Sequence, residues 1–268
     1  MTPALPSTLW RAVRDELRIA FHYPYTLLQV ILLNAVLVVV LWYFAPPKID
    51  ELVFDVHSPA LFTIVLAGWM YSDVPATNVL ASDSTRSLAA LDDRSMMLRL
   101  MRAKRLSLWV LVAPVCTVIT VVMAERSQHR FTEVVAILSI VVLPLGTLAI
   151  AGWVGILWPY HPRSIRYRWR HRRDWFHDLV RWGILIVLPY GLVPVIGVML
   201  LVPSLLLWGV HTEEQVVDLS TVPNLVGGIL VALAMTVGAT VLGDRVGWRL
   251  IKRRHTALRH YLEHPELG

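Results

Sequence analysis

VVAILSIVVLPLGTLAIAGWVGILW, at residues 134–158, contains no charged side chain. A helix of about 20 apolar residues crosses the hydrocarbon core of a bilayer and satisfies its own backbone hydrogen-bonding groups. The stretch therefore predicts a membrane-spanning helix. The rest of the chain agrees, because 56% of its 268 residues are hydrophobic and only 16% are charged, against about 25% charged in soluble domains.

Five further apolar runs of similar length predict an all-α polytopic membrane protein. The six predicted spans lie at residues 25–44, 60–81, 106–124, 134–158, 183–208 and 225–242. Asp73 and Pro75 interrupt the second span. Three prolines in the fifth, Pro189, Pro194 and Pro203, can kink or break it, because proline removes a backbone donor from a helix.

Lysine and arginine residues gather in alternate segments between the spans. Only Lys48, Arg126 and Arg130 fall outside these segments, which leaves 22 of 25 basic residues on one side of the membrane. Cytoplasmic segments carry the excess of positive charge, so both termini are expected in the cytoplasm. The predicted organisation is an N-terminal segment (1–24), a transmembrane domain (25–242) that includes a basic cytoplasmic loop (159–182), and a cytoplasmic tail (243–268).

Two stretches predict helices with a particular surface. Residues 7–23 form an amphipathic pattern that favours a helix lying along the inner membrane interface. Its apolar positions are Leu9, Trp10, Val13 and Leu17. Ala239, Gly243 and Gly247 recur at intervals of four and would let another helix approach closely. We interpret this stripe as a packing surface, and a substrate groove is the alternative.

The motifs of common enzymes are missing from the sequence. No phosphate-binding Gly-x-x-x-x-Gly-Lys-Ser/Thr loop occurs, so a partner would have to handle any ATP. The single cysteine, Cys116, excludes a disulfide framework and a thiolate metal cluster within the chain. The net charge of +6 lies in the loops that orient a membrane protein, so nucleic-acid binding is not expected. His171, Asp174 and His177 can share a helical face and would form the site of a membrane-embedded enzyme, which is the alternative function.

Four polar residues fall within or at the ends of the first two predicted spans, and they are candidates for a substrate path: Gln29, Asn34, Asp73 and Asn78. A carboxylate at bilayer depth is costly unless it meets water, a partner or a proton. Asp73 therefore either lines a polar path or faces the inner interface at the end of a shorter span. For Gln29 and Asn34, hydrogen bonding between helices is the favoured interpretation.

The segment 82–105 between spans two and three combines apolar and basic side chains. Asp93 can cap a short helix, whose apolar face contains Met96, Met97, Leu98, Leu100 and Met101. Arg94 and Lys104 are among the basic residues around it. The face either packs against the inner ends of the spans or binds a cytoplasmic partner, because methionine surfaces adapt to partners.

Three stretches resemble motifs of the permease subunits of type-2 ABC exporters, particularly those of actinobacterial style. Residues 78–83, NVLASD, resemble the family's Asn-x-Phe-Gly-x-Asp pattern at the inner end of span two. Residues 102–104, RAK, resemble its Gly-Lys entry to span three, and residues 155–162, GILWPYHP, are similar to its Phe-Pro-Tyr-Pro ending of span four. The chain departs from the family at Leu80 and Ala81, which replace Phe and Gly, and at Ala103, which replaces Gly.

The resemblance implies a permease subunit in a bacterial plasma membrane, without catalytic residues or a metal of its own. A second permease chain, identical or different, would complete the path, and ATPase subunits would bind ATP and Mg²⁺. The helix after Asp93 would then be the coupling helix that contacts the ATPase. A scaffold that transports nothing is a third alternative.

Overall fold

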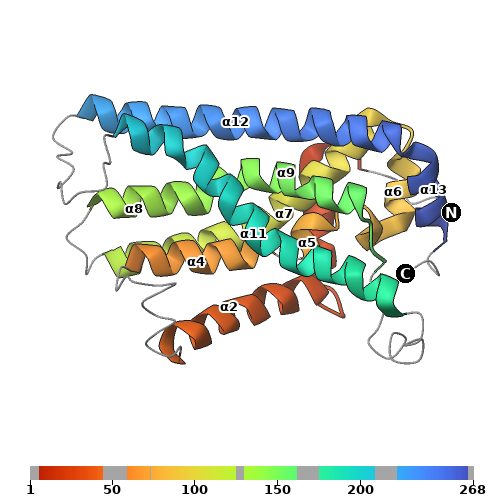
Figure 1. Cartoon of the computed structure of the whole chain (residues 1–268), viewed down its shortest axis with the longest axis horizontal. Helices are drawn as coiled ribbons and strands as arrows, with labels where there is room; N and C mark the ends of the chain where they lie inside the picture. The colour runs from red at the N-terminus through yellow and green to blue at the C-terminus, as the bar shows by residue number, and fades with distance from the viewer. Residues whose placement is uncertain are drawn as a thin grey trace.

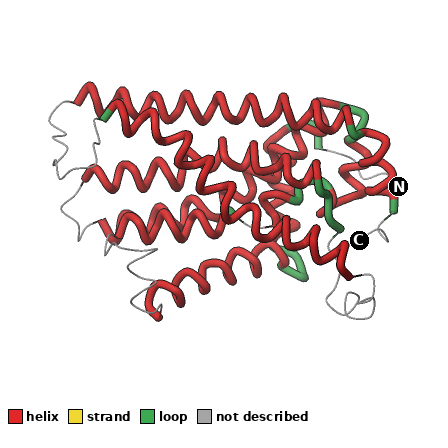
Figure 2. The backbone as a smooth tube through the Cα atoms, in the orientation of Figure 1, coloured by secondary structure: helices red, strands yellow, loops and turns green. Residues whose placement is uncertain are grey.

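The computed structural model describes residues 6–44, 59–72, 74–124, 130–161, 175–208 and 222–264. These residues form helices and a few short turns, without a strand among them (Figure 2). The elements are α1 (Leu9–Ala20), α2 (Thr26–Phe44), α4 (Pro59–Tyr71), α5 (Val74–Thr77), η1 (Ala81–Asp83), α6 (Ser84–Ala90), α7 (Arg94–Ala124), α8 (Arg130–Ile137), η2 (Leu138–Val142), α9 (Leu143–Leu157), α11 (Trp175–Leu207), α12 (Val222–Arg253) and α13 (His255–Glu263).

Four helical stretches are long and apolar enough to cross a membrane: Arg94–Val122, Glu133–Leu157, Val187–Leu207 and Leu225–Arg253. They correspond to predicted spans three to six. The helices α2 and α4 are apolar but contribute only shorter stretches to the described residues. The all-helical, multi-pass character is therefore confirmed, whereas the number of six spans and the orientation of the termini stay predictions.

Three helices continue well beyond the predicted spans, and one of them is α11, which begins at Trp175 rather than at residue 183. α7 begins at Arg94 rather than at residue 106, and α12 continues to Arg253 rather than ending at residue 242. The residues added to α7 and α12 are mostly Leu, Met, Arg and Lys, which favour helix and need not lie in lipid. The prediction of a separate short helix after Asp93 is therefore wrong, because that stretch forms the first turns of α7.

The two predicted interruptions behave differently. α11 runs as one helix through Pro189, Pro194 and Pro203, so these prolines do not break it. α4 ends at Tyr71 and α5 begins at Val74, which confirms the predicted interruption of the second apolar run. Asp73 itself lies outside the described residues.

The longest helix contact joins α9 to α12, which lie side by side (Figure 1). A Cβ added at Gly243 would come within 2.7 Å of Ala149 Cβ and 2.8 Å of the Ala149 carbonyl oxygen. One turn earlier, Ala239 faces Gly146. The Nε1 of Trp153 donates to the Gly243 carbonyl at 2.9 Å. The small-residue stripe is therefore a packing surface, as the sequence predicts.

At the π-helical turn η2, α4 and α7 are hydrogen-bonded to the helix formed by α8, η2 and α9. Pro144 has no N–H, so the carbonyl of Ile140 loses its usual helical donor. The hydroxyl of Tyr71 donates to that carbonyl at 3.2 Å, and Nε1 of Trp109 donates to the next carbonyl, that of Val141, at 2.7 Å. Backbone groups freed in an apolar environment need such partners, and here they tie α4 and α7 to the α8–η2–α9 helix.

The amphipathic helix α1 packs on the first half of α7, where Ala12 and Val13 contact Ala103. Trp10 is 73% exposed and does not share that face, which differs from the predicted apolar stripe. At one end of the bundle α6 and α13 lie together, away from the ends at which α8 and α12 begin (Figure 1). The placement of α1 at a membrane interface stays a prediction.

Candidate functional site

The three family-like stretches, far apart in the sequence, meet at the end of the bundle that holds α6. The Nζ of Lys104 donates to the Val79 carbonyl at 2.8 Å and to Ser82 Oγ at 2.9 Å. The Nδ2 of Asn78 donates to the Tyr160 carbonyl at 2.7 Å. The turn that follows α5 thus binds both the α7 stretch and the stretch at the end of α9.

The path of the chain between α5 and η1 explains why Lys104 and Gly155 are needed beside it. Residues 78–80 form a turn between α5 and η1, so their carbonyls lack the partners that a continuous helix would supply. Lys104 satisfies one of them. On the side of the turn that faces α9, a Cβ at Gly155 would collide with the carbonyl of Thr77 and lie 3.0 Å from Asn78 Cα. Only glycine therefore lets α9 approach the turn this closely.

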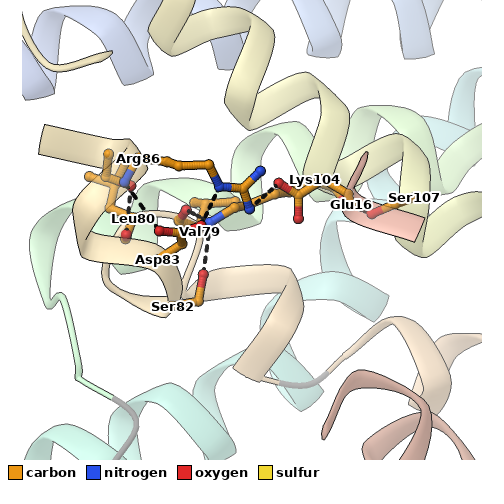
Figure 3. Close-up of polar contacts among 9 residues, drawn as sticks. Glu16, Val79, Leu80, Ser82, Asp83, Arg86, Lys104 and Ser107 are labelled. Carbon is orange, nitrogen blue, oxygen red and sulfur yellow. Dashed lines mark hydrogen bonds and ion pairs between the residues drawn. The ribbon is translucent and has the colours of Figure 1, made fainter. Parts of the chain in front are cut away.

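An ion-pair chain links α1 to this turn (Figure 3). Arg86 contacts Glu16 of α1 at 2.8 Å and pairs on its other side with Asp83. Asp83 also caps α6, because its Oδ1 accepts from the backbone N–H of Arg86 at 3.1 Å. Ser87 Oγ donates to the Leu80 carbonyl at 2.7 Å and holds α6 against the turn.

The network keeps its carboxylate and guanidinium charged. Burial alone would raise the pKa of Asp83, but hydrogen bonds from Arg86 and the charges of Arg86 and Lys104 hold it below its ordinary value. Burial likewise works to lower the pKa of Arg86, and the charge of Glu16 together with the contacts from Asp83 raises it overall. The ion pair between Asp83 and Arg86 therefore persists at neutral pH.

A cavity of about 670 Å³ opens beside this network. Its walls come from the end of α1, the turn into α2, the stretch from the 78–80 turn through η1 to the start of α6, and the part of α7 around Lys104 and Leu108. Ile19 and Tyr23 line it and are 54% and 87% exposed, so the cavity reaches the surface of the chain. It is lined partly by charged and partly by apolar side chains.

The candidate path residues are not joined in one site. Gln29 is exposed on α2. Asn34 is buried, and its Oδ1 accepts from the hydroxyl of Tyr190 at 2.9 Å. This bond between α2 and α11 supports the interpretation of Asn34 as an interhelical contact. Asn78 lies instead in the turn of residues 78–80, which we call the motif turn. Asp73 falls outside the described residues.

The capping role of Asp93 is confirmed, because its Oδ1 accepts from the N–H groups of Ser95 at 2.7 Å and Met96 at 3.2 Å. The Ser95 hydroxyl, which donates to the same Oδ1 at 2.7 Å, lowers the pKa of Asp93 most, and these two N–H groups lower it further. The apolar face that follows is turned inward: Met97, Leu100 and Met101 pack with residues of α6, α9, α12 and α13. Of the two alternatives for this face, packing within the chain is the one that the structure shows.

The turn before α7 and the first residues of that helix are open to a partner. Asp93, Arg94 and Met96 are exposed there, whereas Met97 has no exposed surface. Asp92 in the same turn contacts His255 at 2.8 Å and Arg259 at 2.5 Å, both in α13. Lys104 lies away from this turn, against Val79 and Ser82. Whether any of these residues contacts an ATPase stays a prediction.

A buried ion cluster joins α7 to α12. Asp244 pairs with Arg105, and both side chains are about 5% exposed. Arg102 Nε donates to Asp244 Oδ2 at 2.6 Å from a more exposed position. Sequence reasoning missed Asp244, although a lone acid directly after an apolar run of span length is a signal that could have found it.

The end of α9 is held by α12 and α13. Arg254 donates to the carbonyls of Ile156, at 3.0 Å, and Leu157. The His161 ring stacks on Tyr261 with centroids 4.7 Å apart and donates from Nε2 to the Tyr261 carbonyl at 2.9 Å. The third family-like stretch is therefore fixed to the tail as well as to Asn78.

The alternative enzymatic site is not described. His171 and Asp174 lie outside the described residues, and the side chain of His177 is not described either. Among the residues that are described, no three His, Cys, Asp or Glu side chains lie close enough together to hold a metal ion.

No family model, curated protein or solved structure matches this chain.

Proposed function

We propose that the chain is the membrane-spanning permease subunit of an ATP-driven exporter of the type-2 ABC class. One observation carries the proposal: the three stretches that resemble the family's motifs are bonded to one another, through Lys104 to Val79 and Asn78 to Tyr160. Packed and hydrogen-bonded residues are a physical route by which one part of a helix bundle can move another.

The long helix α7 supports a route for coupling. It is 31 residues long and joins the exposed turn around Asp93 to the membrane-spanning part without a break. Its buried Met97, Leu100 and Met101 pack on residues of α12 and α13 such as Ile251 and Leu258. A push on the turn would therefore move α7, α12 and α13 together, because packed helices shift as units.

In this proposal the partner subunits supply the ATP chemistry. They would bind ATP and Mg²⁺ and contact the exposed Asp93, Arg94 and Met96, while Met97, Leu100, Met101 and Lys104 transmit the movement within the chain. A second permease chain would pair with this one, and the substrate path would form between the two. Closure of the ATPase pair would then shift a two-state equilibrium of the membrane helices.

Purification of the tagged chain from its native membrane in mild detergent tests the proposal. Met96→Asp should release the ATPase subunit, because a buried interface anchor is worth about 2 kcal/mol or more, roughly a thirtyfold loss of affinity. Ala257→Asp is the matched control, because it adds the same charge at an exposed position of α13.

Both variants should insert and unfold like the wild type. If no nucleotide-hydrolysing protein accompanies the wild-type chain, the proposal fails. If both variants retain the ATPase equally, the coupling contact does not involve Met96.

A further inference from the structure

The cavity beside the motif turn has two chemically different walls. Apolar side chains from the end of α1, from α2 and from α7 form one wall: Ile19, Ala20, Leu27, Val30 and Leu108. The other wall contains Ser82, Asp83, Arg86 and Lys104. A ligand that fits both walls must be amphipathic.

Along α7 the charged wall comes before the apolar wall, in the order in which the headgroup layer of a membrane comes before its hydrocarbon core. Lys104 precedes Leu108 by about one turn of α7, and the apolar run of that helix begins between them. α2 has no charged residue from Thr26 to Phe44. The apolar wall therefore lies toward the hydrocarbon and the charged wall toward the headgroup layer.

Three exposed aromatic side chains lie around the turn from α1 to α2, which forms part of the cavity wall. Phe21, Tyr23 and Tyr25 are 59%, 87% and 45% exposed around the turn from α1 to α2. Exposed aromatic rings concentrate where the membrane meets water. The mouth of the cavity is thus at the height of lipid headgroups.

The charges of the lining match a phosphodiester. The cavity is lined by three cationic side chains, Arg18, Arg86 and Lys104, and by two carboxylates, Glu16 and Asp83. The excess of one positive charge equals the single negative charge of a diester phosphate. Lys104 is held in place by Val79 and Ser82, so it presents an ordered ammonium to that side.

A buried acceptor in the lining lacks a donor. Asn78 is only 2% exposed, and its Nδ2 is bonded to the Tyr160 carbonyl. Its Oδ1 has no hydrogen-bond partner among the residues that the structure describes. A buried polar atom without a partner costs free energy, so a ligand with a hydrogen-bond donor next to its phosphate would satisfy it.

We propose that this cavity binds a membrane glycerophospholipid, with its phosphate at Lys104 and Arg86, a headgroup donor at Asn78, and an acyl chain along Leu27, Val30 and Leu108. The donor can be a hydroxyl, as in phosphatidylglycerol, or an ammonium, as in phosphatidylethanolamine. Both share the phosphodiester and the adjacent donor. The bound lipid would fill the space between α1 and the bundle. Lipid binding at this site does not depend on the proposed transport function.

Photolabelling of the full chain tests the proposal. The purified chain is reconstituted in phosphatidylcholine nanodiscs with trace phosphatidylglycerol or phosphatidylethanolamine that carries a diazirine in the acyl chain. Peptide mapping after irradiation should find label concentrated on residues 19–30 and 104–108. Phosphatidylcholine and diacylglycerol with the same acyl diazirine are the comparison probes, because the first has no headgroup donor and the second no phosphate.

Two substitutions separate the cavity from general lipid contact. Val30→Trp should fill the cavity from α2 and abolish the label there. Val36→Trp, the matched control, adds the same ring at an exposed position of the same helix and should leave the label unchanged. Lys104→Gln should reduce it about tenfold, the loss expected for one charge-assisted hydrogen bond.

Stronger labelling by either donor-bearing lipid than by both comparison probes supports the proposal and identifies the donor. Equal labelling by all four probes overturns it. An identical pattern in Val30→Trp and Val36→Trp also overturns it, because the lipid would then bind only the outer surface of the helices.

Discussion

Asp244→Asn should strongly destabilise the chain, because it leaves the buried guanidinium of Arg105 without its carboxylate. The Arg105 side chain is 6% exposed and that of Asp244 is 5% exposed, so water cannot replace the lost partner. Removing one member of such a buried pair costs about 3 to 5 kcal/mol. Arg102 is 48% exposed, so its contact adds at most about 1 kcal/mol. The free energy of unfolding should therefore fall by about 3 to 5 kcal/mol.

Titration of SDS into the chain in mild detergent, followed by tryptophan fluorescence, measures this change. Asp92→Asn is the matched control, because Asp92 also contacts two basic side chains but is 68% exposed. Its effect should be much smaller. The double variant Asp244→Asn/Arg105→Met should recover most of the loss, since it removes the unpaired charge. Equal effects of the two Asp→Asn changes, or simple additivity in the double variant, would refute the reasoning.

Three further predictions address packing, pH and topology. Gly243→Ala should lower the free energy of unfolding by about 1 to 3 kcal/mol in the same assay. Gly238→Ala should be tolerated, because an added Cβ there has nothing within 4 Å. Similar results for both variants would contradict the α9–α12 packing. The lowered pKa of Asp83 stabilises the fold above its ordinary value of 3.8, and this contribution is lost as the pH falls below that value toward the folded-state pKa. The difference in unfolding free energy between wild type and Asp83→Asn should therefore be constant near neutral pH and shrink in acid, and a difference that grew in acid would show the opposite sign. In a variant whose native cysteine is replaced by alanine, Ser127→Cys should react with an impermeant thiol reagent on intact cells and Thr85→Cys should not; reversed labelling would invert the topology.

The apolar runs predicted the membrane-spanning character because hydrophobicity and length are local properties of a segment. The same pattern could not predict where helices end. α7 starts at Arg94 and α12 continues to Arg253, because helix formation depends on propensity and packing as well as on lipid. The stripe at Gly243 was predictable as a packing surface, but its partner Ala149 was not.

The candidate site was predictable only in part. Asn78, Lys104 and the stretch ending at residue 162 could be selected from the sequence by resemblance, and Asp93 could be predicted as a cap from its position. The sequence also suggested an apolar face at Met97 and Leu100, yet whether that face met a partner or the chain itself depended on where α12 and α13 lie. Glu16 was missed because nothing nearby in the sequence marks Arg86 as its partner. Asp244 could have been selected by its place after an apolar run, but its partner Arg105, 139 positions away, could not.

The sequence by itself determined that this is a helical, multi-pass membrane protein, because the cost of burying charge in lipid acts on each segment separately. Only the tertiary structure decided which residues form a site. Lys104 binds Val79, Asn78 binds the Tyr160 carbonyl and Asp244 pairs with Arg105. These residues are separated by 25, 82 and 139 positions, and such contacts depend on how helices approach and rotate against one another. That approach is set by close-packed surfaces such as Gly155 and Gly243, where a single methyl group would change the distance between two helices.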